Sequence, residues 1–412
     1  MASDVNGAQA APAPGASSLF SAGFLALNLQ FALVTAIAAS FFAFSGYLQF
    51  LGIGPATAGF IISADALAAL IVQPLITPLV HAGTARRWLC GGSLLLALAL
   101  FMAGRVTTVP FLVAARLLQG SGFICVVAAL ITMIVQFIPP EMSGRAFGWI
   151  SLVRLVPYAV IPPLYDLLRV TPGSFGTVLN VAVVAALAPV LVLALPRPEQ
   201  AENRESARPP GITGMRDSLR CRPVLMLLLS TLLFFSGYSG IFFYLKQFGT
   251  GRGIVNVSLF FSIATVVMIA VRLLGGWMFD RYSKVLLCGT ALLLTAASYA
   301  LLPAFAGGGL FFPLAAATGL GWGIAMPLQA AVMFDISEPG ARAMNQNLLI
   351  VMMQGGFFIG PFLGGRLISC SGYETLFFSL AAVTLAAMIM MAGVGRFSRE
   401  QIQQTQNQSP GK

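Results

Sequence analysis

The sequence is poor in the residues that most enzymes use for chemistry. Only 9% of its 412 residues are charged, and it contains a single histidine, His81. One histidine cannot supply the cluster of ligands that a typical zinc site needs. No serine or cysteine stands in a motif with a base, and the sequence has no G-x-x-x-x-G-K-[ST] phosphate-binding loop. We therefore expect neither an enzyme nor an ATP-driven pump, and we expect no cofactor and no metal.

Cysteine is also scarce. The five cysteines are odd in number and lie far apart in the sequence, at Cys90, Cys125, Cys221, Cys288 and Cys370. Most of them lie in apolar segments, where a thiol behaves as a small hydrophobic side chain. Their placement favours a packing role over a disulfide or a metal site.

Hydrophobic residues, in contrast, make up 58% of the chain. Crossing the roughly 30 Å hydrocarbon core of a bilayer takes a helix of about 20 residues. Twelve apolar segments of about this length follow one another: residues 22–48, 56–80, 88–106, 109–138, 145–168, 175–195, 223–247, 257–279, 284–304, 309–334, 345–369 and 373–395. Because lipid satisfies no backbone hydrogen bonds, these segments should be helices. The predicted fold class is an all-α membrane protein with twelve transmembrane helices.

The chain repeats itself at an offset of 197 residues. Tyr47 and Leu48 return as Tyr244 and Leu245, and the same shift aligns several loop positions, Arg87 with Lys284, Gly92 with Gly289, Glu141 with Glu338, and Arg145 with Arg342. Two halves of like orientation around a shared axis are a common way to build a transporter, with the solute site between them. We therefore predict two pseudo-symmetric six-helix bundles.

The positions of the basic residues along the chain suggest why the net charge is +10. If both termini are cytoplasmic, fifteen basic residues fall in cytoplasmic segments and five in outer loops or helix ends, namely Arg105, Arg169, Lys246, Arg252 and Arg366. This asymmetry is the positive-inside bias, which sets orientation. We therefore expect cytoplasmic termini and a multi-pass protein of the cell membrane, and we expect no nucleic-acid partner.

Composition also predicts the domain boundaries. The N-terminal residues are rich in Ala, Pro, Gly and Ser and lack the basic cluster of a signal peptide. We therefore expect residues 1–21 to form a disordered cytoplasmic tail and residues 396–412 to form a cytoplasmic C-terminal tail. Residues 196–222 carry six arginines, four acidic residues and four prolines, which is typical of a flexible linker. The predicted bundles are residues 22–195 and 223–395.

Three short motifs follow in order along the chain. They comprise Arg116 with Gln119, Gly120 and Gly122; the stretch 276–284 with Gly276, Asp280, Arg281 and Lys284; and Gly360 with Pro361, Gly364 and Gly365. Together with the twelve segments and the repeat, they resemble the major facilitator superfamily over residues 22–395. The resemblance implies a secondary transporter in which the loop 276–284 acts in the conformational switch, Arg116 takes part in proton coupling, and the glycine motifs pack helices.

Two features depart from that family pattern. The first-half loop keeps the basic pair Arg86 and Arg87 but has Gly83 where the second half has Asp280, so its latch should be weaker. The G-P-x-x-G-G pattern is associated with exporters when it lies in the fifth segment, whereas here it lies in the eleventh. The resemblance therefore gives only a leaning towards export.

Four ionisable side chains stand deep in the predicted spans: Asp65, Arg116, Arg154 and Arg272. Such groups are costly in a bilayer and mark a pathway or a structural pair. Asp65 and Arg116 lie seven to nine residues, or roughly 10–14 Å, below the predicted outer surface. Their matched depth favours an ion pair, and Asp65 is the candidate proton-coupling site. The alternative for Arg116 is a purely structural tie between helices.

The fifth segment carries a polar stripe. Ser151, Tyr158 and Tyr165 fall within about 60° of Arg154 on a helix. Such a stripe should face a cavity or a neighbouring helix rather than lipid, and we predict substrate binding by these four residues. By the same spacing, Thr265 lies on the face of Arg272, and Asn347 lies on the face of Gln354. Arg272, Asn347 and Gln354 are further candidates for substrate binding. The alternative for Arg272 is a structural tether to the loop 276–284, and the alternative for Asn347 and Gln354 is hydrogen bonding between helices.

Three buried positive charges against one negative favour an anionic solute. The leading hypothesis is a proton-coupled transporter of small organic molecules, leaning to efflux by alternating access and acting as a monomer in the lipid bilayer. Its alternative is uptake or exchange of an organic anion. A membrane receptor or scaffold without transport is a third hypothesis, which would not need the buried charges.

Overall fold

The computed structural model describes residues 21–407 except 78, 82, 139–142, 191–218, 276–280, 306–308 and 339–340. Helices of the first half are α1 (Ala22–Ser40), the 3₁₀ turn η1 (Phe41–Ala43), α2 (Phe44–Phe50), α3 (Pro55–Ile76), α4 (Ala85–Ala103), α5 (Val109–Val135), α6 (Ser143–Leu167), η3 (Pro172–Ser174) and α7 (Phe175–Leu187). The second half contains α9 (Arg222–Gly251), α10 (Leu259–Leu274), α12 (Lys284–Phe305), α13 (Phe311–Ile336) and α14 (Arg342–Asn407).

The final helix, α14, contains two of the predicted spans. Its segment Met344–Arg396 is 53 residues long, or about 80 Å at 1.5 Å per residue, which is enough for two crossings. The helix is interrupted at Gly372, whose φ of 80° and ψ of 179° are not helical. Glycine adopts positive φ without the penalty that a Cβ brings. The chain therefore turns back at this residue between residues 345–369 and 373–395.

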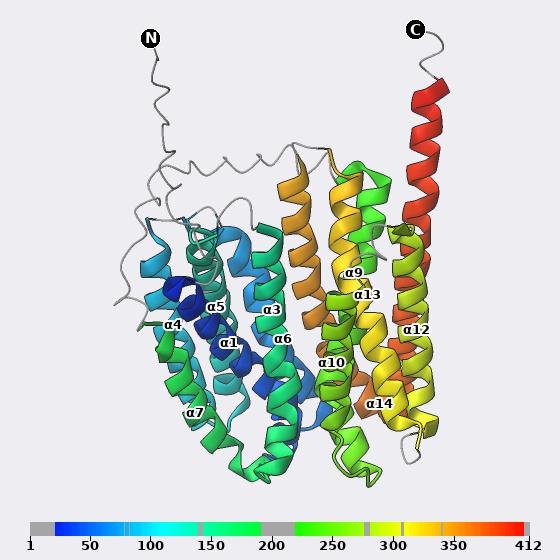
Figure 1. Ribbon diagram of the computed structural model, residues 1–412. Helices are drawn as coiled ribbons and strands as arrows, with labels where there is room; N and C mark the ends of the chain where they lie inside the picture. The colour runs from blue at the N-terminus through cyan, green and yellow to red at the C-terminus, as the bar shows by residue number, and fades with distance from the viewer. Residues whose placement is uncertain are drawn as a thin grey trace, which may run out of the picture.

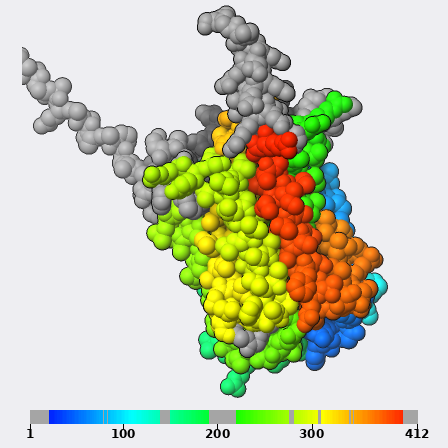
Figure 2. All heavy atoms as spheres, turned by 90° about the vertical axis from the view of Figure 1, so that its right-hand side faces the viewer, coloured from blue at the N-terminus to red at the C-terminus, as the bar shows by residue number. Residues whose placement is uncertain are grey.

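The described helices suit a membrane in length and composition. Ten helical segments are long and apolar enough to cross it, and α10, with 16 residues, is apolar but shorter. Large apolar side chains point outwards where lipid would lie, for example Leu286 and Leu293 on α12, 67% and 49% exposed. Figure 2 shows α12 beside the C-terminal half of α14 on one such face.

The helices gather into two groups, as Figure 1 shows. The helices from α1 to α7 contact one another on one side, and those from α9 to α14 do so on the other. Each group buries a layer of small and aromatic side chains, and the groups touch through α3 with α14 and through α6 with α10. The prediction of an all-α membrane protein built from two helical bundles is confirmed. The predicted linker 196–222 lies mostly outside the described residues.

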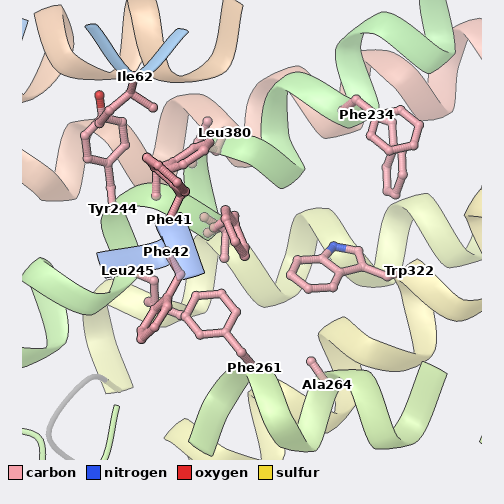
Figure 3. Close-up of a cluster of buried hydrophobic side chains, with 14 of the residues drawn as sticks. Phe41, Phe42, Ile62, Phe234, Tyr244, Leu245, Phe261, Ala264, Trp322 and Leu380 are labelled. Carbon is pink, nitrogen blue, oxygen red and sulfur yellow. The ribbon is translucent and has the colours of Figure 1, made fainter. Parts of the chain in front are cut away.

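The groups meet closely at one end of the molecule, where α2 and α9 end and α3 begins, here called the Lys246 end. Lys246 on α9 forms an ion pair with Asp166 on α6 at 3.2 Å. Ser262 on α10 donates to the carbonyl oxygen of Ala159 on α6 at 2.7 Å. Deeper in the same seam, the rings of Phe42 and Phe261 lie side by side with centroids 6.0 Å apart (Figure 3).

Two glycines allow α3 and α14 to approach closely at this end. Gly59 on α3 lies against Gly365 on α14, and a Cβ built on Gly365 would stand 2.9 Å from the Cα of Gly59. Only residues without a side chain allow two helix backbones to come so close. The hydroxyl of Tyr244 fixes this part of α14 by donating to the carbonyl oxygen of Pro361 at 2.7 Å.

Candidate functional site

A cavity of about 390 Å³ lies between the two helical groups. Its lining comes from α1, α3, α5 and α6 on one side and from α9, α10, α13 and α14 on the other. This volume falls in the range of small-molecule sites, which is about 300–1,000 Å³. Because both groups contribute to the walls, a bound solute would touch both.

The first membrane segment is broken beside Arg116 on α5. The 3₁₀ turn η1 separates α1 from α2 and places two rings against the guanidinium of Arg116, with distances of 4.5 Å to the centroid of Phe41 and 5.2 Å to that of Phe44. Arginine is stabilised by aromatic faces in such positions. These rings cover Arg116, which is fully buried.

Arg116 forms the ion pair that its depth predicted. Its Nη2 lies 2.6 Å from Oδ1 of Asp65 on α3 and donates to the carbonyl oxygen of Ile62 at 2.9 Å, while Nη1 donates to Oε1 of Gln119 at 2.8 Å. The Asp65 side chain is 31% exposed and lines the cavity. A carboxylate held by a buried guanidinium, yet open to the cavity, can exchange a proton with the solution there.

The motif that begins at Arg116 serves both packing and charge. Gly120 lies against the backbone of Asp65, whose carbonyl carbon would stand 2.6 Å from a Cβ at that position, and Gly122 lies against Leu96 on α4. These glycines therefore bring α5 against α3 and α4, as expected. Gln119 does more than pack, because its amide oxygen holds Arg116 and its side chain reaches the cavity.

The polar stripe of α6 faces the cavity over its first part. Ser151, Arg154 and Tyr158 all line it. Arg154 is exposed to the cavity, and its guanidinium carbon lies 5.1 Å from the ring centroid of Phe31. Among the described residues, no carboxylate pairs with Arg154 and no hydrogen bond engages it. The guanidinium is therefore available to a solute.

Arg272 approaches the same stripe from the other helical group. Its Nη1 donates to the hydroxyl of Ser151, and its Nη2 lies 4.0 Å from the sulfur of Met326. Its Nε is buried without a hydrogen-bond partner within the described structure. The hydrogen bond to Ser151 shows that Arg272 links the two helical groups.

An aromatic wall completes the cavity. Phe235, Tyr238 and Phe242 follow one another along one face of α9, and Phe357 of α14 stands beside them. The ring centroids of Tyr238 and Phe242 are 6.4 Å apart and those of Tyr238 and Phe357 are 5.7 Å apart. Sequence reasoning missed this wall, because α9 carries aromatic residues around most of its circumference.

Two of the predicted substrate residues lie elsewhere. Tyr165 is buried against Phe42 near the Lys246 end, and its ring centroid is 5.3 Å from that of Phe42. It shares a face with Arg154 but lies eleven residues, or about 16 Å, further along α6. Asn347 is exposed and does not line the cavity, whereas Gln354 does.

Comparison with known proteins fits this architecture. A model of the family described as "Major Facilitator Superfamily" matches residues 19–344 and 257–410. The chain belongs to the major facilitator superfamily. It is therefore a transporter-family protein of the membrane and not an enzyme, as the sequence predicted.

The chain is also similar to a curated relative and to several solved structures. A riboflavin transporter of Brucella anthropi is 24% identical over 267 residues, which cover 61% of this chain and 65% of the relative, less than two thirds of its length. A variant of the nucleoside transporter NupG superposes with a TM-score of 0.77 at 16% identity, covering 90% of this chain and 99% of that one. A bacterial homologue of the human lysosomal transporter Spinster, in an inward-facing and occupied conformation, gives a TM-score of 0.71 at 16% identity, covering 93% and 98%. These structural matches show the shared fold.

The superfamily's loop motif is only partly visible. Gly276 and Asp280 lie outside the described residues, and Arg281 is exposed. Lys284 forms an ion pair with Asp335 at the end of α13, 2.7 Å apart. In the first half, Arg86 is half-buried and Arg87 is exposed at the start of α4. Their roles in a conformational switch stay a prediction.

The glycine motif of α14 lies at contacts between helices. Gly360 lies against Ser239 and Gly364 against Tyr244, both on α9, while Gly365 crosses α3 at Gly59. The motif therefore serves two contacts, one within a helical group and one between the groups. Among the described residues, no group of three or more His, Cys, Asp or Glu side chains could hold a metal ion.

Proposed function

We propose that this protein is a proton-coupled secondary transporter that carries a small organic solute by alternating access. The observation that supports it most is the central cavity, which both helical groups line and which holds the Asp65–Arg116 ion pair at its edge. Rocking of one group against the other would open the cavity alternately to the two sides of the membrane. The close contacts at the Lys246 end correspond to one of the two states.

Asp65 is the proposed proton carrier. It is the one acidic residue that lines the cavity in the described structure. In one state the carboxylate is ionised and paired with Arg116, and in the other it is protonated and released. A neutral side chain at this position cannot carry a proton, so coupling depends on it.

Export is the proposed direction, as proton–solute antiport. The Lys246 end is the outer end if the basic residues follow the positive-inside rule. Protons that enter from outside would then neutralise Asp65 and drive the empty carrier back for another solute. Uptake or exchange of an organic anion is the second candidate. It is favoured by Arg154 and Arg272, which line the cavity and form no ion pair within the described residues.

The relatives suggest which solutes to try first. The curated relative is a transporter of riboflavin, and the solved structures include a nucleoside transporter. Both solutes carry a flat heterocycle, which suits a cavity walled by Phe235, Tyr238 and Phe242. We propose a flat, ring-containing solute for this chain as well.

The experiment is transport by purified protein in liposomes with and without a pH gradient, using riboflavin, a nucleoside and aromatic carboxylates. Asp65→Asn should abolish accumulation driven by the gradient and retain solute exchange at equal concentrations. Glu374→Gln is the matched control, because Glu374 pairs with Arg252 at the Lys246 end of the second group, away from the cavity. Gradient-driven accumulation at the native level by Asp65→Asn overturns the coupling role, and no transport of any solute supports the receptor hypothesis.

A further inference from the structure

We infer that the cavity selects a flat aromatic anion, whose charged group is held by Arg154 of one bundle and Arg272 of the other. This inference rests on the proposed role of the cavity as the solute site. It goes further by assigning the class of solute and the two residues that recognise its charge. A carboxylate and a phosphate share the required chemistry, namely two or more oxygens that accept from planar guanidinium groups.

The first step is the placement of the two arginines. Arg272 donates to the hydroxyl of Ser151. Ser151 and Arg154 are three residues apart on α6, which puts them on the same side of the helix with a rise of about 4.5 Å between them. The hydrogen bond therefore holds the guanidinium of Arg272 about one helical turn from Arg154. Their charges are close enough to interact with each other.

The second step is the lack of a counter-charge. The cavity's own carboxylate, Asp65, is engaged by Arg116. Arg154 has the ring of Phe31 beside it, and Arg272 has a hydroxyl and a thioether. No ion pair within the described residues includes either arginine. Two like charges in a site of low dielectric repel strongly, and an anion between them would remove that repulsion.

The third step is the open donor capacity. A guanidinium has five N–H donors in a planar fork. Nε of Arg272 is buried and has no hydrogen-bond partner among the described residues, and the Arg154 guanidinium is open to the cavity. A single carboxylate can accept from both forks at once. A neutral polar group can accept at most part of this set and leaves the charges uncompensated.

The fourth step is the surface available to the rest of the solute. The wall of Phe235, Tyr238, Phe242 and Phe357 lines the same cavity as the two arginines. Tyr158 connects the two regions, because it follows Arg154 by one turn on α6 and its ring centroid lies 5.8 Å from that of Phe242. Offset or edge-to-face contacts with these rings favour an aromatic body over an aliphatic one.

The test is equilibrium binding to the purified full chain in lipid nanodiscs by titration calorimetry. Three probes separate the two parts of the inference: 2-naphthoate, its neutral isostere 2-naphthamide, and decahydronaphthalene-2-carboxylate, which keeps the charge without the aromatic rings. Naphthoate should bind at least about 10-fold tighter than naphthamide, because hydrogen bonds to charged groups are the stronger ones. It should bind about 2- to 10-fold tighter than the saturated acid. 2-Naphthyl phosphate then distinguishes a phosphate site from a carboxylate site.

Variants assign the charge recognition to the two arginines. Arg154→Gln and Arg272→Gln should each weaken naphthoate binding by about 10- to 100-fold and leave naphthamide within about threefold. Arg154→Lys keeps the charge but loses the planar, bidentate donors of the guanidinium. Its affinity for naphthoate should therefore fall between those of the native protein and Arg154→Gln. Arg105→Gln is the matched control, since Arg105 is exposed beside Phe101 and outside the cavity. Thermal unfolding of each variant checks the fold.

Four results overturn the inference: equal affinity for naphthoate and naphthamide, no binding of any probe at millimolar concentration, a saturated acid that binds as tightly as naphthoate, or a naphthoate affinity in both glutamine variants within twofold of the native value. None of them bears on proton coupling, because the measurement involves neither a gradient nor Asp65. Conversely, loss of coupling in the transport assay would leave these affinities unchanged. The two proposals can therefore fail separately.

Discussion

Asp65 and Arg116 are joined by an ion pair of 2.6 Å whose two members face different surroundings. The Arg116 side chain is 1% exposed and lies against the rings of Phe41 and Phe44, whereas the Asp65 side chain is 31% exposed and reaches the cavity. A proton arriving through the cavity therefore meets the carboxylate first. The guanidinium behind it is held by the carbonyl oxygen of Ile62 and stays in place.

Replacement of the buried Arg116 should lower the free energy of unfolding more than neutralisation of the partly exposed Asp65. Arg116→Leu leaves the Asp65 carboxylate and the Ile62 carbonyl without their donor, and loss of one member of a buried pair costs about 3–5 kcal/mol. We expect the thermal unfolding midpoint to fall by roughly 5 °C or more. The double variant Asp65→Asn with Arg116→Leu should recover at least half of this loss, because no unpaired charge remains.

Arg366→Leu provides the control for this series. Arg366 is exposed, and its guanidinium carbon lies 4.7 Å from the ring centroid of Phe362. Its removal should shift the midpoint by no more than about 2 °C, since exposed charges contribute little. A double variant as unstable as Arg116→Leu would show that the two residues are not energetically coupled.

The ion pair between Lys246 and Asp166 should hold the Lys246 end closed. It joins the two helical groups, and its side chains are only 20% and 28% exposed. Lys246→Gln or Asp166→Asn should increase the labelling of an Ala159→Cys reporter by a water-soluble maleimide about 2- to 10-fold. The charge swap, Lys246→Asp with Asp166→Lys, should restore part of the protection, although it loses the contact of Lys246 with the Phe42 ring, now 4.5 Å from Nζ to centroid.

The pair of Arg252 and Glu374 gives a matched comparison, because it joins α9 to α14 within one group. Arg252→Gln should leave the labelling of Ala159→Cys unchanged. Equal effects of Arg252→Gln and Lys246→Gln would mean that the reporter follows local loosening and not the separation of the groups.

The orientation in the membrane is predicted by the basic residues and can be tested directly. In a background with Cys370→Ser, Gly54→Cys should react with an impermeant reagent from outside and Gly211→Cys only from inside. Gly54 is exposed at the Lys246 end, and a Cβ there meets no atom within 4 Å. Reaction of Gly211→Cys from outside would invert the topology and with it the proposed direction of transport.

Several features of the site could be predicted because they depend only on the position of a residue along and around its own helix. The matched depths of Asp65 and Arg116 gave their ion pair, and the 100° spacing on α6 placed Ser151 and Tyr158 beside Arg154. Tyr165 has the right angle but the wrong depth, because it lies beyond the residues that line the cavity and packs against Phe42. Periodicity gives the face of a helix, while the ends of a cavity depend on both bundles together.

Other features could not be read from one helix. The partner of Arg272 is Ser151, which is 121 residues away in sequence and belongs to the other group. The aromatic wall was hidden because α9 also carries aromatic side chains that do not line the cavity, such as Phe234 and Tyr244. Where every face of a helix is apolar, only the neighbouring helices decide which side chains face a cavity.

The crossing of Gly59 and Gly365 should be needed to close the Lys246 end. A side chain at position 365 would meet the Cα of Gly59 at 2.9 Å and its backbone nitrogen at 3.1 Å, and neither backbone atom can move aside without moving α3. Gly365→Val should therefore keep α3 and α14 apart at this end, with Gly365→Ala giving a smaller effect. We expect transport in liposomes to fall at least about 10-fold in Gly365→Val, because both states are needed for turnover. We also expect the labelling of Ala159→Cys to rise.

Gly289→Val is the control, since a Cβ at Gly289 on α12 meets nothing within 4 Å. Native transport by a folded Gly365→Val protein would show that closure at this crossing is not part of the transport cycle.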